Sequence, residues 1–293
     1  MGEIIRIITS DGAVMASAIT GTDIVARAAQ IHGTSATATA ALGRTLLAAS
    51  MMGNQLKSEE NTLTLQVRGD GPLGGITCVA DYYGNVRGFV NNPDADVDRK
   101  YEGKLDVGAA VGEGSLTVIK DLGMRDPYVG SIQLVSGEIA EDVTAYYAES
   151  EQIPTACALG VLVKSGTNEV IAAGGFLLQM LPGATDDEIS RVERGLAKAK
   201  PVTSDMTAGK SVLDIVTEVL SEFEVEVLDR TEVSYKCYCS RERVVKALIS
   251  LGTEEMTELI EDQGSADLTC QFCDAVYHFD RADLQEILDN MTP

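Results

Sequence analysis

The sequence is poor in positive charge. Its 293 residues include 45 acidic and 23 basic side chains, which gives a formal net charge of −22 at pH 7. Nucleic acids and anionic membrane surfaces bind proteins largely through lysine and arginine, so we expect neither as a partner. Hydrophobic residues make up 45 % of the chain, which is enough for a packed core and excludes disorder of the whole chain.

Long apolar runs and an export signal are also missing. The longest uncharged apolar stretch covers roughly residues 170–181 and contains two glycines and a glutamine. A membrane-spanning helix needs about 20 apolar residues. Glu3 and Arg6 interrupt the apolar N-terminal segment, which argues against a secretory signal. We therefore expect a soluble, cytoplasmic protein.

The hallmarks of several enzyme classes are absent. The chain has 2 histidines, and neither lies near a nucleophile motif, so a Ser–His–Asp hydrolase is not indicated. No Walker motif is present, which argues against a nucleotide as partner. His32 precedes Gly33, and we expect it at the C-terminal end of a helix. We expect His278 to be an ordinary side chain on a strand.

Residues 1–180 predict one α+β domain. Leu63, Leu65 and Val67 alternate with polar residues, as in a half-buried strand. Helices are expected from Thr22, over residues 37–56 and over residues 139–150. The order of elements favours an antiparallel sheet with helices on one side. Strands are expected near residues 4–8, 13–18, 63–67, 76–80, 86–90, 116–120, 130–134, 157–163 and 170–177.

Residues 181–231 are predicted to form an amphipathic helical linker. The segment holds 11 acidic and 6 basic residues and has too few apolar ones for a core of its own. Thr185 to Glu188 form a capping-box pattern, and two helices carry one-sided apolar stripes. One interpretation is a pair of surface helices packed on the first domain. The stripes consist of Ile189, Val192 and Leu196 in the first helix, and Leu213, Val216, Leu220 and Phe223 in the second.

Residues 232–293 are predicted to form a small third domain. Ser240, Thr253 and Asp280 can each cap a helix, and residues 267–279 are typical of a hairpin with two cysteines at its turn. A domain of about 60 residues has a marginal core and often needs a metal ion or disulfides for stability.

Six cysteines are divided between two settings. Cys78 and Cys157 are isolated in apolar runs, where a cysteine usually serves as a small buried hydrophobe. The other four fall within the last 57 residues. In a chain without an export signal, such a cluster indicates metal or redox chemistry rather than a static disulfide framework. These four are Cys237, Cys239, Cys270 and Cys273.

The spacing of the four cysteines predicts one Zn²⁺ per chain. A C-x-C pair is followed, after 30 residues, by a C-x₂-C pair. Four thiolates around a tetrahedral zinc ion make a closed structural site without a position for water. Both sulfurs of the C-x-C pair can bind one ion only if the backbone bends there. Two unrelated pairs, or an iron–sulfur cluster, are the alternatives.

Zinc-bound thiolates are already deprotonated and therefore open to oxidants. The shortest loops close most readily, which favours local disulfides, Cys237–Cys239 and Cys270–Cys273, over cross-pairs that close loops of about 30 residues. The Cys237–Cys239 ring is tight, so cross-pairs remain an alternative.

The cysteine arrangement at the end of an acidic chain of this length resembles the bacterial redox-regulated heat-shock chaperones, the thirty-three-kilodalton chaperonin family. Residues 128–161, YVGSIQLVSGEIAEDVTAYYAESEQIPTACALGV, are similar to the most characteristic stretch of that family. The resemblance covers nearly the whole chain, and the family's zinc-binding cysteines correspond to the four above. It implies an ATP-independent holdase, zinc-bound and inactive when reduced, disulfide-bonded and active after oxidation, and usually a homodimer.

The resemblance changes the interpretation of residues 181–231. Unfolding of the zinc domain is then expected to remove the support of the linker helices and expose their apolar stripes, which bind unfolded client proteins. A thiol–disulfide oxidoreductase is disfavoured because Cys270 and Cys273 do not follow a βαβ pattern. A zinc-ribbon nucleic-acid binder is disfavoured by the excess of 13 acidic over 5 basic residues in residues 232–293. We therefore expect a protein that is not an enzyme.

Overall fold

The computed structural model describes residues 1–98, 100–101 and 104–291. The chain forms two compact units, residues 1–236 and 237–293. The predicted linker, residues 181–231, belongs to the first unit. A strand, β10 (Val225–Val233), crosses the expected boundary at residue 232 because it pairs with the N-terminal strand.

The described residues of the first unit form two antiparallel sheets of five strands each, which confirms the predicted fold class. The strand order of the first sheet is β10-β1-β2-β9-β8, and that of the second is β5-β4-β3-β6-β7. The predicted alternation is confirmed, since Leu63, Leu65 and Val67 on β3 are buried. The remaining strands are β1 (Gly2–Thr9), β2 (Val14–Thr20), β3 (Thr62–Gly69), β4 (Ile76–Asp81), β5 (Val86–Val90), β6 (Gly114–Asp121), β7 (Tyr128–Gln133), β8 (Thr155–Val163) and β9 (Val170–Met180).

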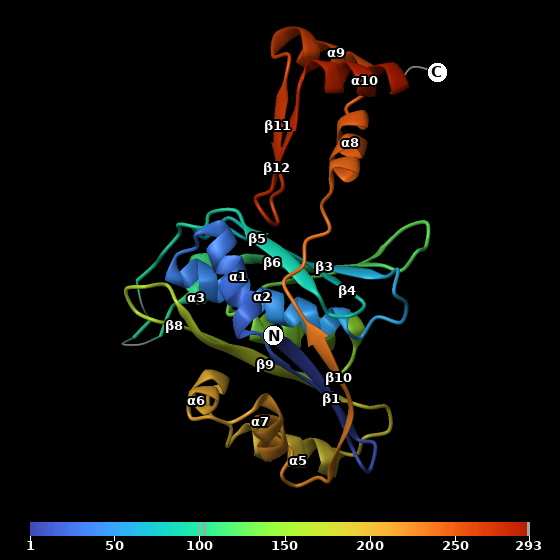
Figure 1. Cartoon of the computed structure of the whole chain (residues 1–293). Helices are drawn as coiled ribbons and strands as arrows, with labels where there is room; N and C mark the ends of the chain where they lie inside the picture. The colour runs from blue at the N-terminus through green and yellow to red at the C-terminus, as the bar shows by residue number, and fades with distance from the viewer. Residues whose placement is uncertain (99, 102–103, 292–293) are drawn as a thin grey trace. The chain divides into compact units, whose positions relative to one another are not determined.

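A buried helix lies between the two sheets (Figure 1). Helix α2 (Ala36–Gly53) contacts β3, β4 and β5 on one side and β8 and β9 on the other, beside α1 (Thr22–His32). It is rich in alanine, leucine and methionine on all sides, as a helix enclosed by two layers must be. The space is tight at Gly43, where a Cβ atom would lie 2.7 Å from Val25 Cγ1.

The expectation of helices on one side of a sheet is therefore wrong. Strands expected to form one sheet form two, and α2 fills the space between them. The expected cap at Thr22 is also wrong. Gly21 is the N-cap of α1, and the Thr22 hydroxyl instead bonds the backbone of Ala173 on β9.

Three short helices cover the outer face of the first sheet (Figure 1). They are α5 (Asp186–Leu196), α6 (Val202–Thr207) and α7 (Val212–Val219), so the predicted polar connection contains a helix that was not expected. The capping box at Thr185 is confirmed, and Ser211 forms a second one on α7.

The residues of both predicted apolar stripes, except Ile189, belong to the hydrophobic cluster that packs on the sheet. Val192, Val216 and Leu220 are buried, whereas Ile189, Leu196, Leu213 and Phe223 are half-buried. The stripe on α7 is centred on Val212, Ile215, Val216 and Val219 rather than on Leu213.

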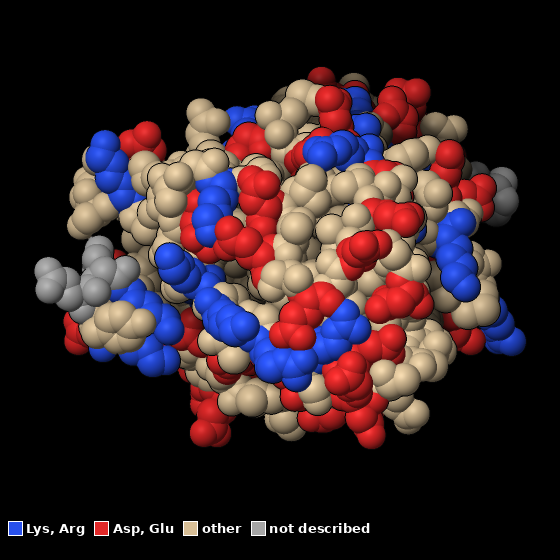
Figure 2. Space-filling view, turned by 90° about the horizontal axis from the view of Figure 1, so that it is seen from below, with Lys and Arg blue, Asp and Glu red and all other residues tan. Residues whose placement is uncertain are grey.

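The outward surface of these helices is charged. Figure 2 shows this face, with basic and acidic side chains interspersed among residues of other kinds. Arg194 pairs with Glu222 at 2.6 Å, and Lys210 pairs with Glu218 at 2.6 Å. The helices therefore present charge to solvent and their apolar side chains to the sheet.

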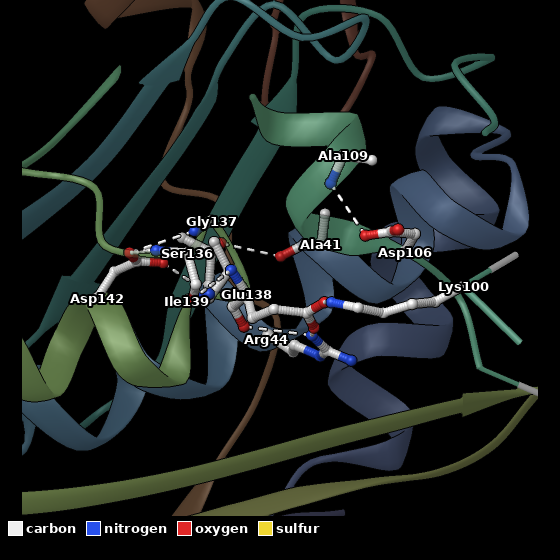
Figure 3. A network of polar contacts seen from close by, with 11 residues as sticks. Ala41, Arg44, Lys100, Asp106, Ala109, Ser136, Gly137, Glu138, Ile139 and Asp142 are labelled. Atoms are coloured by element: carbon white, nitrogen blue, oxygen red, sulfur yellow. Dashed lines mark hydrogen bonds and ion pairs between the residues drawn. The ribbon is translucent and has the colours of Figure 1, made fainter. Parts of the chain in front are cut away.

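A compact polar network fixes the loop before α4 (Ala140–Tyr146) (Figure 3). The buried Asp142 carboxylate accepts backbone hydrogen bonds from residues 135, 136, 137 and 139 at 2.7–3.3 Å. Ile139 has a φ of +73°, which a β-branched residue adopts only under such constraint. Glu138 pairs with Arg44 of α2 at 2.6 Å, so the loop is tied to the central helix. The expected helix over residues 139–150 is thus α4 followed by a π-helical turn, η1 (Tyr147–Glu151).

The second unit has its own small core. Its elements are α8 (Arg241–Ile249), α9 (Thr253–Asp262), the hairpin β11 (Ala266–Thr269) and β12 (Val276–Phe279), and α10 (Arg281–Met291). The structure confirms the predicted hairpin and the predicted caps at Ser240 and Asp280. The expected cap at Thr253 is wrong, because the N-cap of α9 is Gly252. The core consists of Leu248, Met256, Ile260, Phe279, Leu284 and Ile287.

The described residues include no helix that is both long enough and apolar enough to cross a membrane.

Candidate metal centre

The turn of the hairpin brings two thiols together. The Cys270 N–H donates to the Ala275 carbonyl at 2.9 Å, which closes the turn. The Cys270 carbonyl accepts from the N–H groups of Cys273 and Asp274, and Asp274 adopts a φ of +57°. This tight reversal is the local structure that the C-x₂-C spacing predicts.

The C-x-C pair lies in the irregular segment that precedes α8. Cys237 Sγ is 3.7 Å from Cys270 Sγ, and Cys239 Sγ is 3.3 Å from Cys273 Sγ. The four sulfurs lie within 4.8 Å of one another. Because the segment is not a regular strand, neighbours two positions apart can both reach the hairpin turn.

The geometry fits a metal better than a disulfide. Sulfur atoms in a disulfide are about 2.05 Å apart, much closer than either pair here. Four thiolates around a tetrahedral zinc ion, with Zn–S distances of about 2.3 Å, lie about 3.8 Å from one another. An all-sulfur set of this size suits a soft, tetrahedral ion. The cluster can therefore hold a metal ion through four thiolates.

A tyrosine hydrogen bond stabilises charge within the cluster. The Tyr277 hydroxyl on β12 donates to Cys239 Sγ at 3.1 Å. Burial raises the pKa of Cys239, but the hydrogen bonds from Tyr277 and the other cysteines outweigh burial and lower this pKa to about 7. Burial and the neighbouring sulfurs raise the pKa of Cys273. The hydrogen bonds thus favour a thiolate at Cys239, whereas burial and the neighbouring sulfurs disfavour one at Cys273.

Sequence reasoning did not identify Tyr277 as part of this site. The sequence marks Tyr277 only weakly as a site residue, since a tyrosine four positions after Cys273 is an ordinary residue of a hairpin strand. His278 was expected to be an ordinary strand residue. Its Nδ1 lies 2.7 Å from Asp267 Oδ1, opposite it on β11, and not in the cysteine cluster.

The two isolated cysteines lie in the first unit. Cys78 is fully buried on β4, and burial raises its pKa. Cys157 lies on β8, and burial raises its pKa to about 12. His32 ends α1, as expected, with Nε2 2.9 Å from the Gly88 carbonyl oxygen.

Comparison with known proteins identifies the family. The family model described as "Hsp33 protein" matches residues 2–280. The chain belongs to the Hsp33 family. A "33 kDa chaperonin" of Acetivibrio thermocellus is 46% identical over 285 residues, which cover 97% of this chain and 96% of the relative. One of Clostridioides difficile is 44% identical over 98% of this chain and 99% of the relative.

A solved Hsp33 structure has the same architecture. The crystal structure of the 33 kDa chaperonin of Thermotoga maritima, a heat shock protein 33 homologue, has a TM-score of 0.88 and 34% identity, with 98% of each chain covered. The resemblance inferred from the sequence is therefore confirmed. Hsp33 membership supports a chaperone function, and the relatives are named chaperonins rather than enzymes.

Proposed function

We propose that this Hsp33-family protein is a redox-regulated, ATP-independent holdase of the cytoplasm, and that it acts as a homodimer. The observation that carries the proposal is the group of four thiols within 4.8 Å of one another in a small unit. The reduced protein is inactive, and oxidation of the four cysteines activates it to hold unfolding client proteins under oxidative and heat stress.

In the reduced state the four cysteines would hold one Zn²⁺. The ion, when bound, keeps all four sulfurs as thiolates and joins residues 237–239 to the hairpin turn. Among the residues that the structure describes, the second unit has six buried hydrophobic residues, a small core for a unit of 57 residues. Zinc binding in small domains is worth about 10–16 kcal/mol, so folding of this unit depends on the thiolates remaining reduced.

Oxidation removes the ligands. Two thiolates transfer two electrons to a peroxide, an S–S bond forms, and the peroxide O–O bond breaks to give two hydroxide ions. We infer local pairs, Cys237–Cys239 and Cys270–Cys273. In the reduced arrangement, however, the short sulfur–sulfur distances are those of the cross-pairs Cys237–Cys270 and Cys239–Cys273. Once this unit unfolds, however, those distances no longer apply, and the shortest loops close most readily.

The client surface in this proposal is the buried side of α5 and α7. Val192, Val216 and Leu220 now contact the first sheet. Each such side chain contributes about 1.5–3 kcal/mol through burial, so helices that lose the sheet become unstable and leave apolar groups exposed. An unfolded client offers the same kind of surface and can replace the sheet as a partner.

The test is aggregation suppression of a chemically unfolded client by the zinc-loaded protein, before and after peroxide treatment at mildly elevated temperature. We expect suppression only after oxidation. Replacing Leu213 and Leu220 by serine should weaken suppression by the oxidised protein while the zinc content of the reduced protein stays unchanged. Equal suppression by the reduced and oxidised proteins would refute redox control.

A further inference from the structure

Tyr277 connects the cysteine cluster to the core of the second unit. It lies on β12, where two exposed side chains alternate with Tyr277 and the buried Phe279. Its ring packs against the core of this unit and lies opposite Leu268 of β11, which packs against the same core. Its hydroxyl donates to Cys239 Sγ at 3.1 Å. One side chain thus joins the proposed metal ligands to the apolar residues of the unit.

Two of the other sulfurs receive hydrogen bonds from the backbone. The N–H of Cys239 bonds the sulfur of Cys237, and the N–H of Ala275 bonds the sulfur of Cys273. These donors are fixed by the course of the chain and remain after a side-chain substitution. The Tyr277 hydroxyl is different, because a single substitution removes it and leaves the ring in place.

A hydrogen bond from a phenol acts on a metal-bound thiolate in two ways. It is charge-assisted and holds the sulfur in one orientation, as hydrogen bonds around metal ligands generally do. It also makes the electron pairs of the sulfur less available to an electrophile. When a thiolate attacks a peroxide, an S–O bond forms, the O–O bond breaks and hydroxide leaves, so the reaction consumes a sulfur electron pair. A donor bonded to the sulfur therefore slows this step.

We propose that Tyr277 is a positioning residue of the metal centre. Its hydroxyl holds Cys239 in position to bind the ion and lowers the reactivity of this sulfur toward oxidants. Its ring ties the centre to the core, so the loss of Cys239 as a ligand also loosens β12. The inference rests on the proposed function for the identity of the ion, and it adds a residue that sets how readily the centre opens.

The first test measures zinc affinity in the full-length chain. Tyr277→Phe removes the hydroxyl and keeps the ring. Competition with a chromogenic chelator should show that this variant binds Zn²⁺ about tenfold more weakly or worse, since loss of a hydrogen bond to a metal ligand costs about 10–100-fold in affinity. The matched control Val276→Thr replaces a side chain of the same strand, 61% exposed, by one of nearly the same shape, and should leave the affinity unchanged.

A second readout separates protection of one sulfur from a general loosening of the unit. Iodoacetamide alkylates a thiolate, since an S–C bond forms as iodide leaves. Tandem mass spectrometry after partial labelling of the zinc-loaded protein gives the extent of reaction at each cysteine. In Tyr277→Phe, labelling of Cys239 should rise several-fold relative to that of Cys237, whose backbone hydrogen bond remains. A purely structural role would raise the labelling of all four cysteines together and leave this ratio unchanged.

The role of the ring is tested by a third variant. Tyr277→Leu removes the hydroxyl and the aromatic contact together. In excess zinc it should show the same rise in Cys239 labelling as Tyr277→Phe and, in addition, faster amide exchange in α9 and α10, which form the core with β12. Equal exchange in the two variants would show that the ring does not tie the centre to the core.

Two outcomes would overturn the role of the hydroxyl. These are equal zinc affinity of Tyr277→Phe and Val276→Thr, or an unchanged ratio of Cys239 to Cys237 labelling. Failure of peroxide to induce aggregation suppression in the parent protein, with both differences present, would instead refute the proposed redox control and leave the role of Tyr277 standing.

Discussion

Removing the helix caps of the linker tests whether release of α5 and α7 is sufficient for client binding. Thr185 and Ser211 each accept a hydrogen bond from the third residue of the following helix, Glu188 and Asp214. The acidic side chains bond back to the backbone N–H of the caps at 2.6 and 3.0 Å. The double variant Thr185→Ala, Ser211→Ala removes both capping side chains and leaves every apolar residue in place.

The expected effect follows from the energy of a cap. Loss of a serine or threonine cap costs about 1 kcal/mol. The two caps belong to different helices, so their effects should add to about 2 kcal/mol. Because 1.4 kcal/mol corresponds to a factor of ten, the released state should become roughly thirtyfold more populated.

The assays are amide hydrogen exchange and aggregation suppression by the reduced protein. Exchange in α5 and α7 should accelerate about thirtyfold, and the reduced variant should gain holding activity without peroxide. The control Ser35→Ala removes a cap of the same chemistry from α2, in the core of the first unit, and should leave exchange in α5 and α7 unchanged. Faster exchange without any gain in activity would show that release does not create the client site.

Three further predictions concern the thiols and the core. Cys270→Ser should lose most of the bound zinc and the amide protection of residues 237–291, whereas Cys157→Ser should keep both; full zinc content in the first variant would contradict four-thiolate binding. Peptide mapping after peroxide at elevated temperature should find the two local disulfides, and predominant cross-pairs would overturn that assignment. Glu138→Gln should destabilise the first unit by about 3 kcal/mol at pH 7, because Arg44 is then buried without its counter-ion. Burial raises the pKa of Glu138, but Arg44 outweighs burial, so the pKa in the folded protein lies below the ordinary 4.5. The ion pair therefore contributes stability above pH 4.5, and this contribution is lost as the pH falls through the folded pKa. In urea unfolding, the free energies of the variant and the parent protein should become equal in acid.

Local features of this protein were predictable from its sequence. Alternation on β3, the capping box at Thr185, the hairpin around Cys270 and the cap at Ser240 each depend on residues within about five positions of one another. The cysteine cluster was predictable for a related reason, because a metal site of four thiolates imposes a spacing that few other functions require. The structure brings all four sulfurs together in the predicted hairpin turn and the segment before α8.

Features that depend on distant pairing were not predictable. The first sheet joins β1 to β10, and Gly2 pairs with Val233 across almost the whole chain. No local pattern encodes such a partner. The division of the strands into two sheets around α2 has the same origin. The hydrogen bonds from Tyr147 of η1 to Gln55, in the turn after α2, and from Gln55 to Gln179 of β9 join residues far apart in the chain, and each of the three is unremarkable in sequence.

The path of the chain between the linker and the cysteines bears on how oxidation could release α7. After α7, β10 pairs with β1, and the next residues bond the second sheet, with Val86 N–H donating to the Ser234 carbonyl and Lys236 N–H donating to the Val86 carbonyl. The Tyr235 hydroxyl also donates to the Gly88 carbonyl at 2.8 Å.

Residues 225–236 therefore form hydrogen bonds with both sheets of the first unit, and Cys237 is the next residue in the chain. Unfolding that begins at the cysteines cannot reach α7 along the chain until these bonds break. β10 is an edge strand, paired on one side only, with Val227 and Leu228 about half exposed at 45% and 47%. It is thus among the weaker strands of the sheet, yet its loss still requires energy that disulfide formation in the second unit does not supply. Heat supplies it, because unfolding rates rise severalfold with each ten degrees. On this reasoning, oxidant removes the fold of the second unit and temperature sets how far the unfolding extends, so full activation of the proposed holdase requires both.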